Sequence, residues 1–130
     1  TKLTLKKKQI IFISQGPFSE RLIELCINLS KRIDLKQYQI AFRPHPSELA
    51  ANFDKFKSLI KHNIFLFSEN NIYENFNDST YQVGVNSTAL FEGLEFGLKT
   101  FIFKIIDWEM FETVDGVIFI DNEKDILDNL

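Results

Sequence analysis

Four side chains that could bind a phosphate stand in two short polar stretches, each directly after an apolar run. The stretch RPHPSE carries Arg43 and His45, and the stretch NST carries Ser87 and Thr88. A guanidinium or an imidazolium can form charge-assisted hydrogen bonds to a phosphate. Hydroxyls at a helix start lie beside main-chain N–H groups that have no partner within the helix, which adds further donors. These residue types favour a phosphorylated ligand.

His45 lies between two prolines, Pro44 and Pro46. Proline fixes its own φ and restricts the residue before it, so this stretch predicts a short, stiff and extended turn. A stiff turn presents its side chains at a defined place. Taken alone, His45 could be an ordinary surface histidine and Ser87 an ordinary helix cap, but the two stretches together favour a ligand role.

The apolar runs before these stretches belong to a series of six that are rich in Ile, Val and Phe. Most of the runs are continuous rather than alternating, which is typical of strands that are covered on both faces in a parallel sheet. We expect strands at residues 9–14, 38–43, 63–68, 81–85, 100–104 and 116–120.

Between the strands, apolar residues recur at helical spacing. Alternating strands and helices predict right-handed units that stack into a single domain over residues 1–130. The expected fold is α/β: a doubly wound, mostly parallel, Rossmann-like sheet of about six strands with helices on both faces. We expect helices at residues 18–33, 48–61, 87–97 and 122–130, and a shorter helical segment within 69–79.

Open parallel sheets bind ligands at the carboxyl ends of their strands, near the point where the strand order reverses. The loops that carry His45 and Ser87 would meet at that edge, together with Gly16 after the first strand. Gly16 would let the backbone approach a ligand closely, or it is only a connection glycine. Neither the dinucleotide-binding glycine pattern nor the P-loop pattern occurs in the sequence.

The composition restricts the function classes. The formal net charge of −3 over 130 residues argues against a nucleic-acid partner. The single cysteine, Cys26, falls among apolar residues at helical spacing, so we expect it in the core. Because one cysteine cannot form a disulfide within the chain, we expect a reducing, cytoplasmic setting. No metal site is expected, because His45 and His62 lie far apart in the sequence and no acidic cluster accompanies them.

Two stretches together resemble a known family. They are RPHP after the second expected strand, and VGVNSTALFEGLEFGLKTFIF from the fourth expected strand to the fifth. From Gln9 to its end, the chain resembles the C-terminal, donor-binding half of GT-B glycosyltransferases. The resemblance is closest to a bacterial group that includes sialyltransferases, capsule polysaccharide synthesis proteins and CDP-glycerol transferases. Those proteins carry a His-Pro motif and a Ser/Thr pair at a later helix start.

The resemblance implies roles for the residues of the first stretch. His45 would contact the donor phosphate and assist its departure. Pro46 would fix the turn, and Arg43 would lie near the nucleotide base.

The resemblance also implies roles for residues of the later segments. Ser87 and Thr88 would supply the hydroxyls that bind the phosphate. Glu74 is the looser match for a carboxylate on the ribose hydroxyls, and Glu92 is the competing candidate.

As a whole, the resemblance implies an inverting, metal-independent transfer without a cofactor, from a nucleotide-activated sugar or polyol that is often CMP- or CDP-linked. In such proteins the acceptor site and the general base belong to the N-terminal half. Because the sequence begins at Thr1 without a methionine and stops at Leu130 inside an expected helix, we expect an excised C-terminal half that is inactive alone. Its partners would be the nucleotide donor and the N-terminal acceptor domain. A peripheral position at the inner face of the membrane stays open.

Two alternatives also stay open. The first is the UDP-sugar-binding half of a 2-epimerase-like GT-B enzyme, although such proteins usually show a Gly-rich helix start where this chain has NST. The second is a non-catalytic nucleotide-binding or interaction module, because a fold alone does not determine function.

Overall fold

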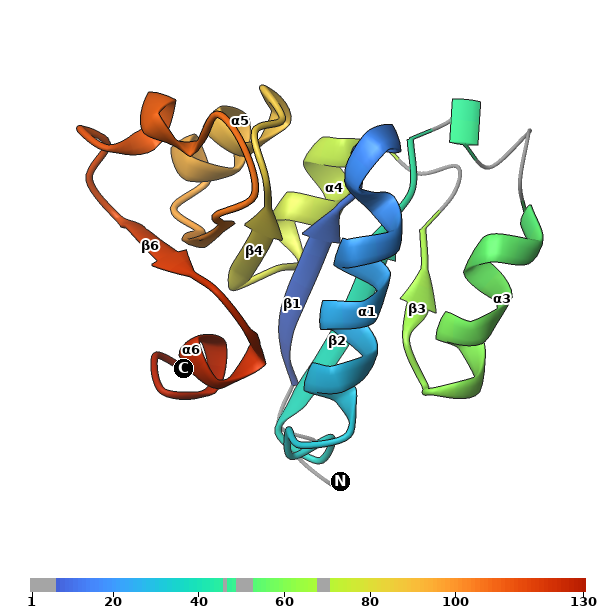
Figure 1. Ribbon diagram of the computed structural model, residues 1–130. Coiled ribbons are helices and arrows are strands. Elements are labelled where there is room, and N and C mark those ends of the chain that lie inside the picture. The colour runs from blue at the N-terminus through green and yellow to red at the C-terminus, as the bar shows by residue number, and fades with distance from the viewer. Residues whose placement is uncertain (1–6, 46, 49–52, 68–70) are drawn as a thin grey trace.

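A parallel sheet of six strands forms the centre of the computed structural model, which describes residues 7–45, 47–48, 53–67 and 71–130 (Figure 1). The order of the strands in space is β3-β2-β1-β4-β5-β6, and neighbouring strands run parallel. The predicted α/β class and Rossmann-like sheet are confirmed. The strands are β1 (Lys8–Ile13), β2 (Tyr38–Arg43), β3 (Phe65–Leu66), β4 (Tyr81–Gly84), β5 (Lys99–Phe103) and β6 (Val117–Ile120).

The strand order reverses next to β1, which has β2 on one side and β4 on the other. In the register of β1 and β2, Ile13 is opposite Arg43, so the two strands end level with each other. The main-chain N–H of Ser14 then donates to the carbonyl of Arg43 at 3.0 Å. The loops that follow β1 and β2 therefore start side by side at the carboxyl edge of the sheet.

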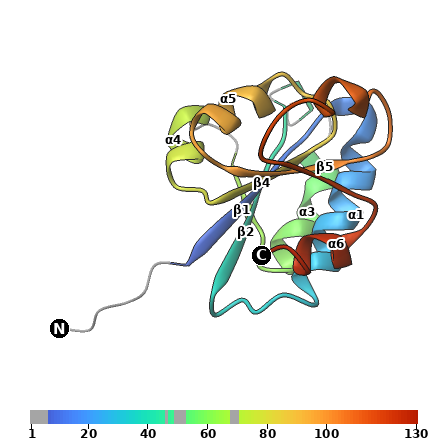
Figure 2. The ribbon, with the colours of Figure 1, turned by 90° about the vertical axis from the view of Figure 1, so that its left-hand side faces the viewer.

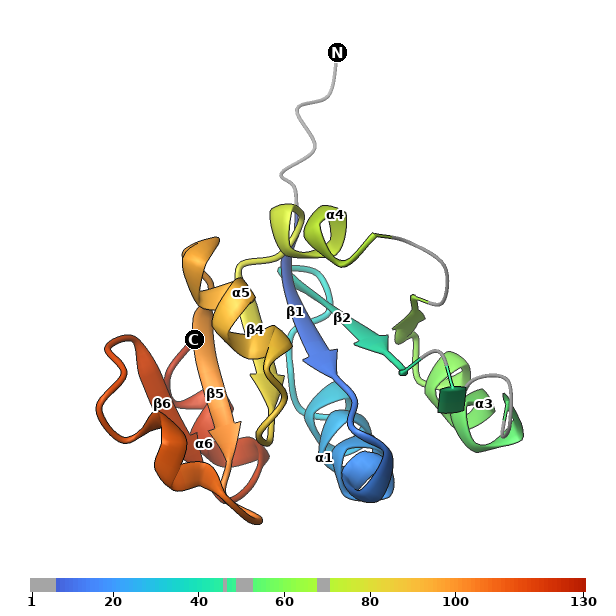
Figure 3. The same cartoon turned by 90° about the horizontal axis from the view of Figure 1, so that it is seen from above.

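Helices cover both faces of the sheet, which confirms the predicted double winding (Figures 2 and 3). One face carries α1 (Ser19–Ser30), α3 (Phe53–Lys61) and α6 (Glu123–Leu127). The other face carries α4 (Ile72–Asn77) and α5 (Ala89–Glu95). Short 3-10 helices, η1 (Gly16–Phe18) and η2 (Trp108–Phe111), follow β1 and β5. Among the described residues, no helix combines the length and the apolar character that crossing a membrane requires.

Some elements are shorter than their apolar patterns predict. β3 begins at Phe65 rather than at residue 63, because Asn63 has a φ of 62° and so belongs to a left-handed turn. α1 ends at Ser30 rather than at residue 33, where the Ser30 hydroxyl donates to the carbonyl of Ile27 at 2.6 Å. A serine that bonds back to the helix in this way competes with continued helical pairing.

The sheet face under α1, α3 and α6 is lined with large apolar side chains. Phe12, Phe42 and Phe101 point to this side and are fully buried. The rings of Phe12 and Phe42 stack with their centroids 6.3 Å apart, and Phe56 of α3 packs on Phe42 at 5.8 Å. Full burial of such a side chain contributes about 1.5–3 kcal/mol relative to exposure. This face holds the larger of two core clusters.

The sheet face under α4 and α5 presents smaller or polar side chains. A Cβ atom on Gly84 would lie 2.7 Å from the side chain of Leu90, so the glycine lets α5 approach β4 closely. The buried amide of Gln82 donates to the carbonyl of Leu90 and to the hydroxyl of Thr100, both at 2.8 Å. α5 is therefore held against the sheet by a polar contact as well as by apolar packing.

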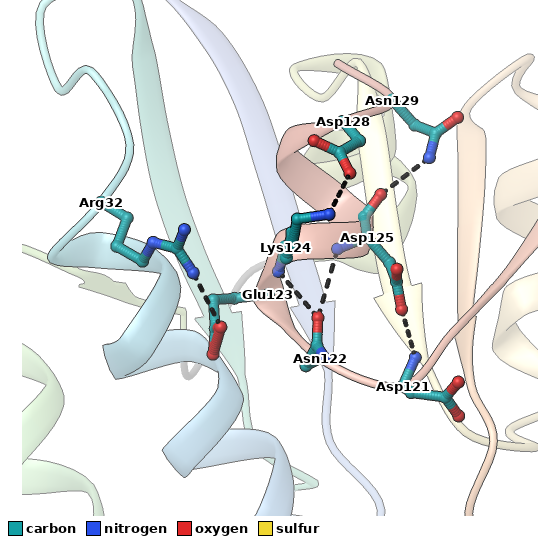
Figure 4. A network of polar contacts seen from close by, with 8 residues as sticks. All are labelled: Arg32, Asp121, Asn122, Glu123, Lys124, Asp125, Asp128 and Asn129. Atoms are coloured by element: carbon teal, nitrogen blue, oxygen red, sulfur yellow. Dashed lines mark hydrogen bonds and ion pairs between the residues drawn. The ribbon is translucent and has the colours of Figure 1, made fainter.

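α6 packs beside α1 and is fixed by polar contacts (Figure 4). The side-chain oxygen of Asn122 accepts hydrogen bonds from the main-chain N–H groups of Lys124 and Asp125 at 3.0 and 3.4 Å and so caps the start of α6. Arg32 of the loop after α1 pairs with Glu123 at 3.1 Å. The contact between Arg32 and Glu123 connects segments that lie 91 residues apart.

Candidate functional site

A cavity of about 180 Å³ opens at the carboxyl ends of β1 and β2. It brings together three residues of the predicted site, Arg43, His45 and Ser87, from two distant parts of the sequence. Its walls come from the ends of both strands and from the starts of α4 and α5: Ile13, Ser14, Arg43, Pro44, His45, Ile72, Ser87 and Ala89. The polar part of the wall thus combines a guanidinium, an imidazole and two hydroxyls.

His45 stands at the start of a helical turn and caps it. Ser47 and Glu48 are helical, and the main-chain N–H of Ser47 donates to Nδ1 of His45 at 3.2 Å. The Ser47 hydroxyl lies 2.7 Å from the same nitrogen. The imidazole thus takes the position that Ser, Thr, Asp or Asn usually fills at a helix start. Pro46, which the sequence also predicts for the site, lies outside the described residues.

Glu48 connects the loop after β2 to the loop after β1. Its Oε1 accepts hydrogen bonds from the main-chain N–H of His45 at 3.0 Å and from the hydroxyl of Ser14 at 2.9 Å. The side chain is only 9% exposed, and Oε2 receives no hydrogen bond from the described residues. The ammonium group of Lys55 lies 3.9 Å from Oε2 and partly offsets the cost of burying the carboxylate.

Arg43 is the last residue of β2, and its guanidinium reaches across to α4. Its Nη1 donates to the side-chain oxygen of Asn75 at 2.6 Å, and Asn75 is 3% exposed. Burial lowers the pKa of the Arg43 guanidinium from its ordinary value, yet an arginine remains protonated at neutral pH. The cavity wall therefore contains a fixed positive charge that a buried amide orients.

Ser87 and Thr88 both precede α5 but differ in their surroundings. The Ser87 hydroxyl lines the cavity and accepts a hydrogen bond from the main-chain N–H of Ala89 at 3.3 Å. Thr88 is exposed, and its side chain makes no capping bond. The main-chain N–H of Asn86 donates to the side chain of Gln15 at 3.1 Å, and Gln15 donates back to the side chain of Asn86. These bonds hold the start of α5 against the loop after β1.

Besides Thr88, three residues that the sequence predicts for the site are not in the cavity wall. Gly16 is exposed at the start of η1, and a Cβ atom there would meet no atom within 4 Å. Glu74 and Glu92 are exposed on α4 and α5. A hydrogen bond to Glu92 raises the pKa of the Tyr73 hydroxyl, so Glu92 already interacts with a neighbouring side chain.

Sequence reasoning missed the residues that join the two loops, Ser14 and Glu48, and the buried Asn75. A signal for Glu48 is present, because a glutamate three residues after a helix-start residue forms half of a capping box. Ser14 directly follows β1, so its place at the carboxyl edge also follows from the strand prediction. Nothing in the local sequence marks Asn75, whose burial results from tertiary packing.

Cys26 is a core residue, as predicted. It is fully buried in α1, and burial raises the pKa of its thiol well above the ordinary value. Because the thiolate is the reactive form of cysteine, this side chain is chemically inert in the folded protein.

A second cavity, of about 190 Å³, lies between α1 and the ends of β5 and β6. The guanidinium of Arg21 stands over the ring of Phe103 at 5.4 Å in its wall, but Glu24, Asp121 and Glu123 surround it with carboxylates. This charge disfavours an anion, in contrast to the cavity beside His45. Within the described ranges, no three His, Cys, Asp or Glu side chains are placed to hold a metal ion.

The fold is that of a Rossmann-like α/β domain, and solved structures share it. The UDP-GlcNAc 2-epimerase of Methanocaldococcus jannaschii shares it with a TM-score of 0.68 at 10% identity, over 97% of this chain and 38% of that one. A second UDP-N-acetylglucosamine 2-epimerase gives a TM-score of 0.60 at 12% identity, over 93% of this chain and 33% of that one. The chain thus spans about a third of the length of either structure.

The chain belongs to the alpha-2,8-polysialyltransferase (POLYST) family, whose profile matches residues 1–103. The match contains both RPHPSE and NST, and so every residue of the predicted site. Membership in this family agrees with the resemblance to sialyltransferases that the sequence shows. Among curated proteins, no relative matched the sequence.

Proposed function

We propose that the chain is the donor-binding domain of an inverting, metal-independent glycosyltransferase, and that the cavity beside His45 holds the phosphate of a CMP- or CDP-linked donor. The convergence of Arg43, His45 and Ser87 in one cavity carries this proposal. Each of the three side chains can donate a hydrogen bond to a phosphate oxygen. Membership in a polysialyltransferase family favours CMP as the nucleotide and a sialic acid as the transferred sugar.

The size of the cavity supports a phosphate rather than a whole nucleotide inside it. Its volume of about 180 Å³ is smaller than the roughly 300–1,000 Å³ of pockets that enclose drug-sized ligands. The ribose and base would extend beyond its mouth, and Glu74 and Glu92, which are exposed on α4 and α5, stay candidates for contact with the ribose. Because Arg43 lines the cavity itself, we assign its guanidinium to the phosphate rather than to the base.

In the proposed reaction, an acceptor hydroxyl attacks the anomeric carbon of the donor from the face opposite the nucleotide. A new carbon–oxygen bond forms while the bond to the phosphate oxygen breaks, and that electron pair leaves with the nucleotide. Hydrogen bonds from Arg43 and His45 stabilise the charge that develops on the phosphate. The acceptor proton goes to a general base that the family resemblance places outside this chain. The chain alone is therefore expected to bind nucleotide without turnover.

Calorimetric titration of the chain with CMP, CDP, UDP and GDP tests the proposal. We expect cytidine nucleotides to bind best, and His45→Ala to weaken CMP binding roughly 10- to 100-fold, because a hydrogen bond to a charged group contributes about 1.5–3 kcal/mol. His62→Ala is the matched control, since His62 lies after α3 and not in the cavity wall. Equal CMP affinity of the wild-type chain and His45→Ala would contradict the proposed site.

A UDP-sugar-binding role is the second candidate, because the solved structures that share the fold are UDP-GlcNAc 2-epimerases. A preference for UDP over CMP in the same titration would favour it. A third candidate, the non-catalytic interaction module, would be favoured if a longer chain that includes a preceding second domain also bound none of the four nucleotides.

A further inference from the structure

The hydrogen bonds around His45 determine which of its ring nitrogens carries the proton. The main-chain N–H of Ser47, 3.2 Å from Nδ1, can only donate, so Nδ1 accepts with its lone pair. The Ser47 hydroxyl, at 2.7 Å, can donate to the same nitrogen. In a neutral imidazole the proton then lies on the other nitrogen, Nε2. The contacts of Ser47 thus select the Nε2–H tautomer, and Nε2 is the nitrogen left to contact a ligand.

Glu48 fixes the main chain that carries this ring. Its Oε1 accepts from the N–H of His45 at 3.0 Å, and its own main-chain N–H donates to the carbonyl of His45 at 2.9 Å. The bond from Ser14 to the same carboxylate oxygen ties this turn to the loop after β1. Among the described residues, the charged groups around the turn are Glu48 itself, Lys55, which pairs with it, and Arg43 in the cavity wall. Arg43 is the cationic residue that the described part of the cavity wall contains.

We propose that Ser47 and Glu48 are positioning residues that hold His45 as the neutral Nε2–H tautomer, which offers a single N–H donor to a phosphate in the cavity. This inference rests on the proposed function and deepens it. His45 then stabilises the departing phosphate by a hydrogen bond and transfers no proton to it. A nucleoside monophosphate has a second pKa of about 6, so it leaves at neutral pH without needing a proton.

Nitrogen-15 NMR of the imidazole rings reads the tautomer directly in the full, ligand-free chain. The chain contains two histidines, so His62 is the one other ring in the spectrum and serves as the comparison. At a pH where both rings are neutral, we expect the Nδ1 of His45 to resonate as an acceptor nitrogen and its Nε2 as a protonated one. A protonated Nδ1 in the neutral His45 ring would overturn the proposal.

Two substitutions of Ser47 separate its hydroxyl from its main chain. Ser47→Ala removes the hydroxyl and keeps the main-chain donor, whereas Ser47→Thr keeps both. We expect the two nitrogen resonances of His45 to move toward each other in the alanine variant, because the Nδ1–H tautomer becomes populated, and to return in the threonine variant. His45 resonances that do not change in Ser47→Ala would exclude Ser47 as a positioning residue.

The role of Glu48 is tested by a second pair of variants. Glu48→Gln retains an oxygen that can accept from His45 and Ser14, and Glu48→Ala does not. We expect CMP affinity to fall roughly 2- to 10-fold in Glu48→Ala, which is the loss expected when one ordinary hydrogen bond between uncharged groups is removed. In Glu48→Gln, we expect CMP affinity to be largely retained. An equal loss in both variants would assign the effect to the charge of Glu48 and overturn its positioning role.

Adding CMP to the labelled wild-type chain separates this inference from the proposed function. We expect CMP to shift Nε2 of His45 while Nδ1 stays unprotonated. Protonation of Nδ1 on addition of CMP would overturn the tautomer proposal and leave nucleotide binding in place. If CMP changed neither ring, the proposed site would fail, whereas the tautomer would still be decided by the ligand-free spectrum.

Discussion

The two faces of the sheet differ in what covers them and in what they contribute. One face is covered by the 12-residue α1 together with α3 and α6, over fully buried phenylalanine rings. The other is covered by the six residues of α4 and the seven of α5, over isoleucines such as Ile11 and over small or polar residues such as Gln82 and Gly84. The cavity beside His45 opens where β1 and β2 meet these shorter helices. We therefore expect that core volume can be removed from the α1 face without a change in ligand binding, whereas changes on the face under α4 and α5 affect both stability and binding.

The most severe test of this separation removes core volume from the α1 face. Leu29 is fully buried in the C-terminal half of α1 and is not in the cavity wall. Leu29→Ala is expected to lower the free energy of unfolding by about 2–5 kcal/mol, measured in urea, because it leaves a cavity in the core. The folded fraction should bind CMP with unchanged affinity. Weaker CMP binding by the folded variant would mean that the α1 face also contributes to ligand binding.

A substitution on the opposite face should affect both properties. A Cβ atom on Gly93 of α5 would collide with the side-chain amide of Gln82, whose hydrogen bonds hold α5 on the sheet. Gly93→Ala is expected to cost about 1–3 kcal/mol of unfolding free energy, as overpacking does, and to weaken CMP binding because α5 positions Ser87. Gly16→Ala is the control, since a Cβ atom there has open space and should change stability by no more than about 0.5 kcal/mol.

Ser87→Ala should weaken binding with little effect on stability. The loss of one hydroxyl from the cavity wall is expected to lower CMP affinity roughly 2- to 10-fold, while the free energy of unfolding falls by at most about 1 kcal/mol. Thr88→Ala, at the exposed neighbouring residue, distinguishes the cavity wall from the helix start as a whole. An equal effect of both variants on CMP affinity would place the phosphate at the helix start rather than in the cavity.

The smallest effect is expected at the surface of the α1 face. Arg32 is about half exposed and pairs with Glu123 of α6. Arg32→Ala should lower the free energy of unfolding by roughly 0.2–1 kcal/mol at low salt, and by less at high salt, because surface ion pairs are screened. Urea unfolding at two salt concentrations measures this difference. A decrease in the free energy of unfolding well above 1 kcal/mol would mean that the contact between α1 and α6 is part of the core rather than a surface ion pair.

The fold could be predicted from the sequence because its signals are local and repeated. Continuous apolar runs marked the strands, and helical spacing between them marked the helices. The ends of elements depend on single residues instead, such as the left-handed Asn63 before β3 and the serine that ends α1. A periodic pattern contains no information about such endings.

The site could be predicted only in part, for a related reason. His45 and Ser87 each follow a parallel strand, and the carboxyl ends of parallel strands lie at one edge of the sheet. Their proximity could therefore be predicted. The contacts that orient the site join residues that are far apart in the sequence. Ser14 and Glu48 are separated by 34 residues, and Arg43 and Asn75 by 32. Which side chains meet across such separations depends on rotamers and packing, so the contact between Ser14 and Glu48 and the buried Asn75 emerged only from the structure.

The central position of β1 has a consequence for the order in which the protein assembles. The side-chain contact between β1 and β2 closes a separation of 30 residues, whereas the contact from the end of β1 to Asn86 closes one of 71. Shorter loops cost less entropy to close, and the N-terminal part of a chain leaves the ribosome first. We therefore expect β1, β2 and their helices to form an early half-sheet during synthesis. The cavity needs walls from both halves, so the ability to hold a nucleotide would be acquired only once β4 and α5 have docked.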